Sequence, residues 1–256
     1  MEDKYEGEEV KIKSPFLEKL DNFWYHYKWH SLIALFLIVT VTVCSVQMCT
    51  REEYDIYAVY AGRTDVKMTS QDALSDYRIL YTSFGLVCED FDENGEVTPN
   101  LQTLFLPSEE EIEEIEKELD KIYEQTGERY EVQTQLVTQN QSTFADMMLL
   151  SDYYLCFLSE ANYLANRDRM KGFFAPLLPY VGDAEVSYYD GRKEAVYLSS
   201  TAFGSLPGFE KLDEGTLICL RSVSEVAKRA DQGNSEKQFA RAERVLEKIF
   251  AMKSVE

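Results

Sequence analysis

The sequence has only two histidines among its 256 residues, His26 and His30, and both lie in one short aromatic segment. Beyond residue 30 there is therefore no imidazole to activate a serine or cysteine nucleophile or to bind zinc. The motifs G-x-S-x-G, G-x-G-x-x-G, S-x-x-K and the Walker-type phosphate loop are also missing. Only carboxylate chemistry stays open, and 46 acidic residues give no basis for choosing a catalytic pair. We expect a protein that is not an enzyme and has no cofactor.

Cysteine and basic residues are scarce as well. Cys88, Cys156 and Cys219 lie far apart and form no C-x-x-C pair, which argues against a disulfide framework. Cys156 and Cys219 stand within apolar runs, so both are predicted to lie in a core. The chain has 26 Lys and Arg against 46 Asp and Glu, a net charge of −20. Such a charge repels nucleic acid, so we expect no nucleic-acid partner.

One long apolar run is present, from Ser31 to Met48, and it contains no charged residue. A helix of this length is about the minimum for crossing a hydrocarbon core of ~30 Å. The run predicts a single transmembrane helix over residues 31–50 and hence a lipid-bilayer partner. It lacks the small-residue cleavage site of a signal peptide, and neither Cys44 nor Cys49 follows the small residue expected before a lipidated cysteine. We expect an uncleaved anchor in the cell membrane.

The residues before the run are rich in Trp, Tyr and His, which place an apolar body in the membrane interface and a polar tip in water. His26 and His30 stand four residues apart, so a metal-binding or proton-sensing role is the alternative to interfacial packing. Basic residues favour a cytoplasmic N-terminus, because more of them precede the run than follow it closely: Lys11, Lys13, Lys19 and Lys28 against Arg51, Arg63 and Lys67. We therefore predict a cytoplasmic tail with an interfacial segment (1–30), the transmembrane helix (31–50) and an extracytoplasmic domain (51–256).

The predicted extracytoplasmic domain is long enough for one good core or for two small lobes. Strand-like and helix-like segments alternate along it. Strands are predicted over residues 54–60, 77–87, 130–136, 153–158, 194–199 and 217–220, and helices over 108–127, over 142–150 and from Ser235 onward. The continuous apolar strand 153–158, flanked by helices, is typical of a parallel sheet covered on both faces. The fold class is therefore α/β.

The clearest helix signal begins at Ser108, which forms a capping box with Glu111. Four apolar residues follow at helical spacing, and Gly127 is placed to end the helix in a left-handed cap. The stripe consists of Ile112, Ile115, Leu119 and Ile122. Acidic residues surround it, and two interpretations stay open: an acidic docking face or an ordinary solvated face.

The segment Asp90–Val97 has the chemical pattern of a cation loop. Asp90, Asp92 and Asn94, followed by a glycine, match the opening D-x-D-x-N-G of a calcium loop, in which oxygen ligands alternate around a turn. The twelfth position, normally a bidentate glutamate, is Leu101, so a Ca²⁺ site needs a carboxylate from elsewhere in the fold. The alternative is an Asp/Asn/Gly-rich turn without metal.

The aromatic segment Asp21–His30, the residues 54–56 and the loop Asp90–Val97 together resemble a group of uncharacterised single-pass membrane proteins of clostridia-type Gram-positive bacteria. The outer domains of that group resemble extracellular solute-binding proteins. This resemblance implies a bilobal α/β binding-type fold, and it carries over no ligand-contact residue.

Two functions from different classes follow. In the first, the outer domain is a tethered module that binds a small solute or senses a ligand. In the second, it is an anchored scaffold or regulatory subunit of an envelope protein complex with no small-molecule ligand. A cleft with convergent polar groups favours the first, and an exposed apolar patch favours the second.

Overall fold

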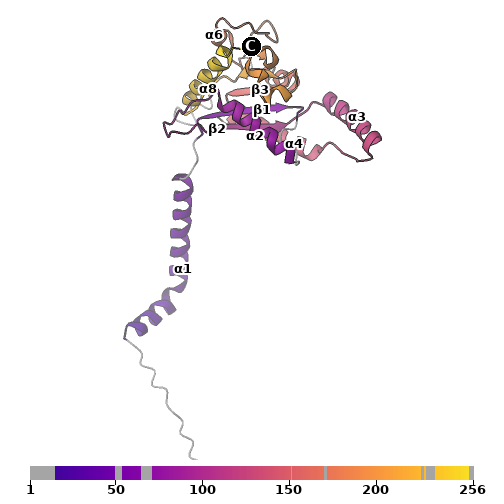
Figure 1. The fold of residues 1–256 in the computed structure, drawn as a ribbon. Coiled ribbons are helices and arrows are strands. Elements are labelled where there is room, and N and C mark those ends of the chain that lie inside the picture. The colour runs from indigo at the N-terminus through magenta and orange to yellow at the C-terminus, as the bar shows by residue number, and fades with distance from the viewer. Residues whose placement is uncertain are drawn as a thin grey trace, which may run out of the picture. The chain divides into compact units, whose positions relative to one another are not determined.

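The chain forms two compact units, one up to Glu53 and one from Tyr54 to Glu256. The computed structural model describes residues 15–49, 54–64, 71–150, 152–169, 172–225, 228 and 234–253. Residues 1–14 of the predicted tail, the predicted domain boundary at 50–53 and Lys67 lie outside these ranges. The single helix α1 represents the first unit, and the second unit holds a sheet with its covering helices (Figure 1).

Helix α1 runs from Pro15 to Cys49. Its part from Phe23 to Val46 has 24 residues and is long and apolar enough to cross a membrane. At 1.5 Å per residue this part is about 36 Å long, against a hydrocarbon core of ~30 Å. The hydroxyls of Thr40 and Thr42 donate to carbonyl oxygens four residues earlier, both at 2.8 Å, so neither needs water. A helix that could span a membrane is confirmed at the predicted place up to Cys49, but it begins earlier because the aromatic segment is helical too.

The second unit is built on one mixed sheet. Its strands are β1 (Ile56–Gly62), β2 (Pro99–Phe105), β3 (Leu155–Leu158), β4 (Ala195–Tyr197) and β5 (Leu217–Leu220). They lie in the order β2-β1-β3-β5-β4; β1 is parallel to β2 and β3, and β5 is antiparallel to β3 and β4. The α/β class is confirmed. The described residues of this unit share the one sheet and do not separate into two lobes.

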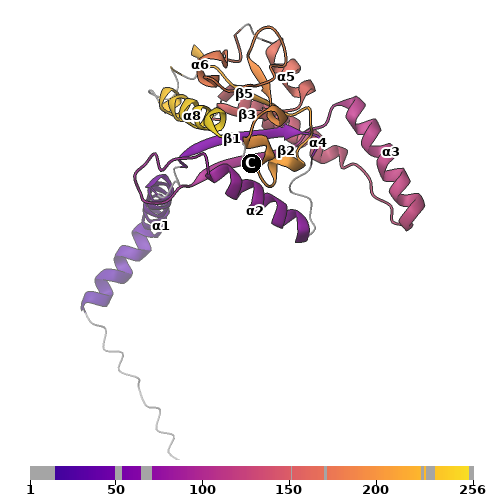
Figure 2. The same ribbon diagram turned by 45° about the horizontal axis from the view of Figure 1, so that its top comes forward.

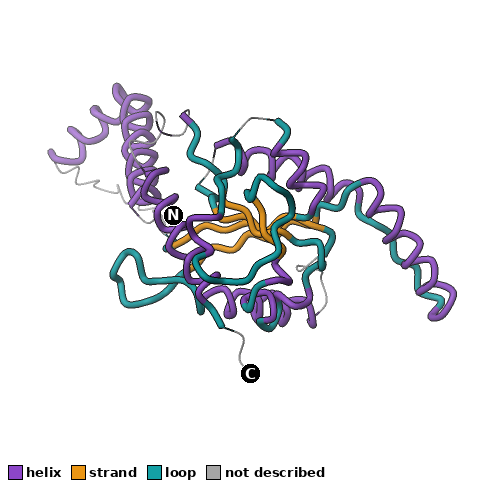
Figure 3. The backbone as a smooth tube through the Cα atoms, turned by 90° about the horizontal axis from the view of Figure 1, so that it is seen from above, coloured by secondary structure: helices purple, strands orange, loops and turns teal. Residues whose placement is uncertain are grey.

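Helices cover both faces of the sheet (Figures 2 and 3). The helices of this unit are α2 (Gln71–Gly85), α3 (Glu109–Thr126), α4 (Thr134–Leu150), α5 (Glu160–Arg167), α6 (Leu178–Val181) and α8 (Asn234–Ala251), of which α3 lies to one side of the sheet. Helices α2 and α8 contribute to the apolar cluster on one face, whereas α4 and α5 contribute to the cluster on the other. Short 3-10 turns at Leu198–Ser200, Phe203–Ser205 and Phe209–Lys211 close the first face.

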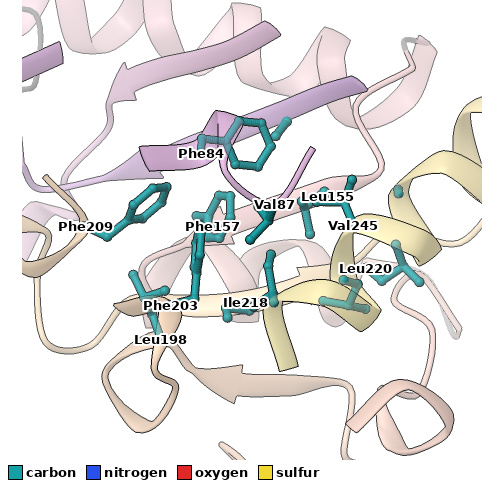
Figure 4. Packing of buried hydrophobic residues seen from close by; sticks show 14 of the residues in the cluster. Phe84, Val87, Leu155, Phe157, Leu198, Phe203, Phe209, Ile218, Leu220 and Val245 are labelled. Carbon is teal, nitrogen blue, oxygen red and sulfur yellow. The ribbon is translucent and has the colours of Figure 1, made fainter. Parts of the chain in front are cut away.

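Successive residues of the central strand β3 enter different clusters, as the alternation of a strand requires. Phe157 lies at the centre of the larger one, with its ring centroid 6.2 Å from that of Phe84, 6.0 Å from Phe203 and 5.5 Å from Phe209 (Figure 4). Its neighbour Cys156 points into the other cluster together with Cys219 of β5, and both are fully buried. The prediction that these two cysteines are core residues is confirmed.

Two predicted strands are wrong. Most of residues 77–87 belongs to helix α2, in which Leu80 and Phe84, one turn apart, are buried apolar residues. The β-forming Tyr and Ile of that segment hid the helical spacing. Residues 130–136 hold no strand either, because helix α4 begins at Thr134. The alternation over 130–136 was coincidental, since Phe144 and Met148 of the same helix provide its buried face.

Candidate functional site

The predicted calcium loop lies at the amino ends of β1 and β2, and its side chains cap its own backbone. The Asp90 carboxylate accepts from the backbone N–H of Asn94 at 3.1 Å and of Gly95 at 2.7 Å. The carboxylate of Asp92 accepts from the backbone N–H and from the side-chain amide of Asn94, at 3.1 and 2.9 Å. Gly95 has φ of 91°, which favours glycine. The three predicted ligand residues are therefore brought together in one turn.

A fourth residue joins this turn. The buried carboxylate of Asp55 offers an oxygen within 4.8 Å of oxygens of both Asp90 and Asp92. Leu101 at the twelfth loop position is a buried core residue of β2, and Asp55 is the carboxylate from elsewhere in the fold that a Ca²⁺ site would need. The Asp55 carboxylate also accepts from the N–H of Phe91 at 2.7 Å and of Thr98 at 2.8 Å. The sequence feature that could have pointed to Asp55 is its place as an acidic residue directly before the buried strand β1.

This acidic cluster, defined as Asp55, Asp90 and Asp92, has the oxygen donors that Ca²⁺ takes in proteins. The hydrogen bond from the Gly95 N–H lowers the pKa of Asp90, so this carboxylate is ionised at neutral pH. The same carboxylates also satisfy loop N–H groups, which is what an Asx turn does without metal. The calcium site at Asp90, Asp92 and Asn94 therefore stays a prediction, with Asp55 added to its donors.

The carboxyl ends of β1, β2 and β3 meet at the opposite edge of the sheet. In sheets of this kind a ligand crevice forms where successive connections leave a strand in opposite directions, which here is between β1 and β3. Asn162 of α5, shortly after β3, donates through its side-chain amide to the Leu106 carbonyl just after β2 at 2.8 Å and to the Ala61 carbonyl of β1 at 3.3 Å. Asn162 thus joins the carboxyl ends of β1 and β2 from the helix that follows β3.

A hollow of about 430 Å³ lies elsewhere, lined by Arg167, Asp168, Gly172, Arg192 and Glu194. Arg167 is engaged with two carboxylates, Asp168 at 2.9 Å and Asp190 at 3.0 Å. Burial raises the pKa of Glu194. The lining is polar and of both charges, which suits a small zwitterionic or anionic solute better than an apolar one.

Cysteine and histidine, two residue types that commonly take part in catalysis, lie outside the acidic cluster and outside this hollow. Burial raises the pKa of the Cys156 thiol to about 12 and that of Cys219 well above its ordinary value, so both stay protonated at neutral pH. His26 and His30 lie one turn apart on α1, and each has a tyrosine ring beside it, at centroid distances of 5.3 and 6.2 Å. This packing fits the interfacial interpretation of the two histidines.

Helix α3 has the predicted caps at both ends. Ser108 and Glu111 form the capping box, with distances of 2.6 and 3.2 Å, and Gly127 ends the helix in the left-handed conformation with φ of 75°. No residue of the helix is buried. Its apolar stripe therefore belongs to neither of the two core clusters of the described residues. Figures 1 to 3 show α3 to one side of the sheet rather than against one of its faces.

One ion-pair network ties α3 to the sheet. Arg63, directly after β1, pairs with Glu114 at 3.0 Å and with Glu118 at 3.2 Å, which are one turn apart on the helix.

Comparison with protein-family models, with curated proteins and with solved structures finds no match for this chain. The likeness to clostridial solute-binding-type proteins therefore stays a prediction.

Proposed function

We propose that this protein is a membrane-anchored, non-catalytic interaction module of the cell envelope, whose α/β domain binds a protein partner. Helix α1 holds the chain in the lipid bilayer, and the domain from Tyr54 onward provides the binding surface. The observation that carries the proposal is helix α3, because the apolar stripe of this well-capped amphipathic helix is not fully buried and belongs to neither core cluster. Exposed apolar patches on soluble domains commonly mark protein interaction sites.

The position of Asn162 supports the same proposal. A small-molecule site in an α/β sheet is expected in the crevice at the carboxyl ends of the strands. Here the Asn162 amide bridges the ends of β1 and β2, with 2.8 Å to the Leu106 carbonyl. The fold is used as a rigid support and the binding surface lies on a helix outside the core.

We also propose a cytoplasmic N-terminus and an extracytoplasmic domain, because Lys residues are more frequent before the apolar run 31–48 than basic residues are closely after it. Labelling of intact cells with a membrane-impermeant maleimide tests this orientation. Leu178→Cys places a thiol at a residue that is 56% exposed, and Cys88, Cys156 and Cys219 are buried and give little background. We expect labelling of Leu178→Cys and none of Lys13→Cys before the cells are opened. The reverse result contradicts the orientation.

The interaction function is tested on the full chain extracted from native membranes in a mild detergent. We expect a second protein in fixed ratio, and loss of that protein when residues 54–256 are deleted and only the anchor is left. A thermal-shift screen of the same preparation with amino acids, sugars, peptides and organic acids should give no saturable rise in Tm. A lone protomer that one of these solute classes stabilises contradicts the proposal.

Solute binding, as in the outer domains that the sequence resembles, is the second candidate function. The hollow of about 430 Å³ with two arginines, Arg167 and Arg192, favours it. Under this alternative an anionic or zwitterionic solute raises Tm, and Arg192→Ala abolishes the rise. The same variant leaves a protein complex at α3 unchanged, so one preparation distinguishes the two functions.

A further inference from the structure

The apolar stripe of α3 has the spacing of a helix-pairing seam. Ile112, Ile115, Leu119 and Ile122 follow one another at intervals of three, four and three residues, which is the a/d pattern of heptads. Ile122 is 40% exposed and the neighbouring Tyr123 is 51% exposed, while the other three are half-buried. Among the described residues α3 makes no extensive contact with another helix or strand, so most of this seam has no partner helix within the chain.

Acidic residues line both sides of the seam. In heptad positions Glu111 and Glu118 fall at g and Glu116 falls at e, the positions that choose a partner by charge in coiled coils. Neither basic residue of the helix takes part, because Lys117 and Lys121 fall at f and c, away from the seam. The seam is therefore an apolar strip between two negative borders.

Charge decides among the surfaces that could cover this strip. A second copy of α3 would bring Glu against Glu in either orientation, which is repulsive. An anionic lipid surface is repelled for the same reason. A helix with Lys or Arg beside its own apolar seam gains both apolar burial and ion pairs.

We propose that α3 docks a basic amphipathic helix of a partner protein, seated along Ile112, Ile115, Leu119 and Ile122. This inference rests on the proposed interaction function and names its surface and the chemistry of its partner. The chain itself gives an example of the pairing, since Arg63 pairs with Glu118 on the border at 3.2 Å and with Glu114, one turn earlier on the helix, at 3.0 Å. The partner's arginines and lysines would continue this pattern along the open length of α3.

The first test uses the full chain in detergent and two designed helical peptides of about three heptads. Both peptides have Leu at a and d; one has Lys and the other has Glu at e and g. We expect the Lys peptide to bind at least tenfold more tightly by fluorescence anisotropy, and its binding to weaken as salt is raised. Equal affinities or preference for the Glu peptide overturn the proposal.

Two matched pairs of variants locate the binding surface. Leu119→Asp places a charge in the seam and should abolish binding of the Lys peptide, whereas Leu178→Asp, at an exposed leucine of α6, should not. Glu116→Lys on the border should weaken binding, whereas Glu124→Lys on the opposite side of α3 changes the same charge and should not. Since Leu119 is half-buried rather than buried, Leu119→Asp should lower Tm only slightly and leave the helical circular dichroism signal intact. Binding that survives Leu119→Asp overturns the proposal.

The native complex separates this inference from the proposed function. Loss of the envelope partner in Leu119→Asp, but not in Leu178→Asp, supports the docking role of α3. A partner retained in Leu119→Asp shows that the protein binds through another surface, which overturns this inference alone. A dimer of the chain itself, abolished by Leu119→Asp, makes a second copy the occupant and overturns it too. The absence of a partner in wild-type extracts contradicts the interaction function itself.

Discussion

Arg241 of α8 donates a hydrogen bond to the backbone oxygen of Asp55, at 3.0 Å, across 186 residues of sequence. The same guanidinium donates to the carbonyl of Tyr54 at 3.1 Å and lies 5.3 Å from the ring centroid of Phe91. One buried side chain therefore joins the start of the sheet, the last helix and the acidic loop. The Asp55 carboxylate in turn accepts hydrogen bonds from the backbone N–H groups of Phe91 and Thr98, so Arg241 and Asp55 both hold the acidic loop in place.

Arg241→Ala should destabilise the second unit by about 2–4 kcal/mol, because it removes the hydrogen bonds to the carbonyls of Tyr54 and Asp55 and the packing against Phe91. Urea unfolding of residues 54–256, followed by far-UV circular dichroism, measures the change. Arg244→Ala is the control, since Arg244 has a side chain that is 67% exposed and a long ion pair of 3.8 Å with Glu89. It should cost less than ~0.5 kcal/mol. Equal effects of the two variants would show that the Arg241 contacts are not structural.

Asp90 should make the stability of the loop depend on pH. Hydrogen bonding lowers the pKa of the folded carboxyl below the ordinary value of ~3.9, so its contribution is present above that value and is lost as pH falls through the folded pKa. Asp90→Asn should therefore be less stable than wild type at pH 7, and the difference should shrink below about pH 4. Urea midpoints at both pH values test this. Glu93→Gln, with the same loss of charge in the same loop, should show no such convergence.

Local signals in the sequence were enough for much of the fold. Ser108, Glu111 and Gly127 define helix α3 through contacts within a few residues, and the apolar runs of β3 and β5 need no partner to be recognised as strands. Helix α2 was missed because its tyrosines and isoleucine have strand propensity, while its burial on one face is decided by the sheet that it covers. Propensity was overridden by tertiary packing there.

The sites depended on contacts that no local pattern contains. Asp90, Asp92 and Asn94 could be predicted as one turn because their hydrogen bonds span at most five residues. Asp55 could not, since it reaches the turn only after β1 and β2 pair. The same limit applies to α3: an amphipathic stripe predicts that one face is covered, but sequence alone does not say whether the covering residues belong to the same chain.

Calcium should raise the Tm of the second unit when it is present at millimolar concentration. The three carboxylates of the acidic cluster repel one another, and a divalent cation between them removes that repulsion while the few ligands limit its affinity. Differential scanning fluorimetry with CaCl₂ against NaCl of equal ionic strength measures this. Asp92→Asn should abolish the rise and Glu93→Gln should keep it. No difference between the two salts would leave the loop as an Asx turn without metal.

Gly208 should not tolerate a side chain. It has φ of +89°, and a Cβ there would lie 2.8 Å from both the Cα and the backbone nitrogen of Leu80 in α2. Because these are backbone atoms, the contact can be relieved only by moving α2 or the turn, and the positive φ adds strain. Gly208→Ala should therefore lower the free energy of unfolding by about 1–3 kcal/mol in urea. Gly85→Ala, in open space at the end of the same helix, should be neutral or slightly stabilising. A neutral Gly208→Ala would mean that this turn does not pack against α2.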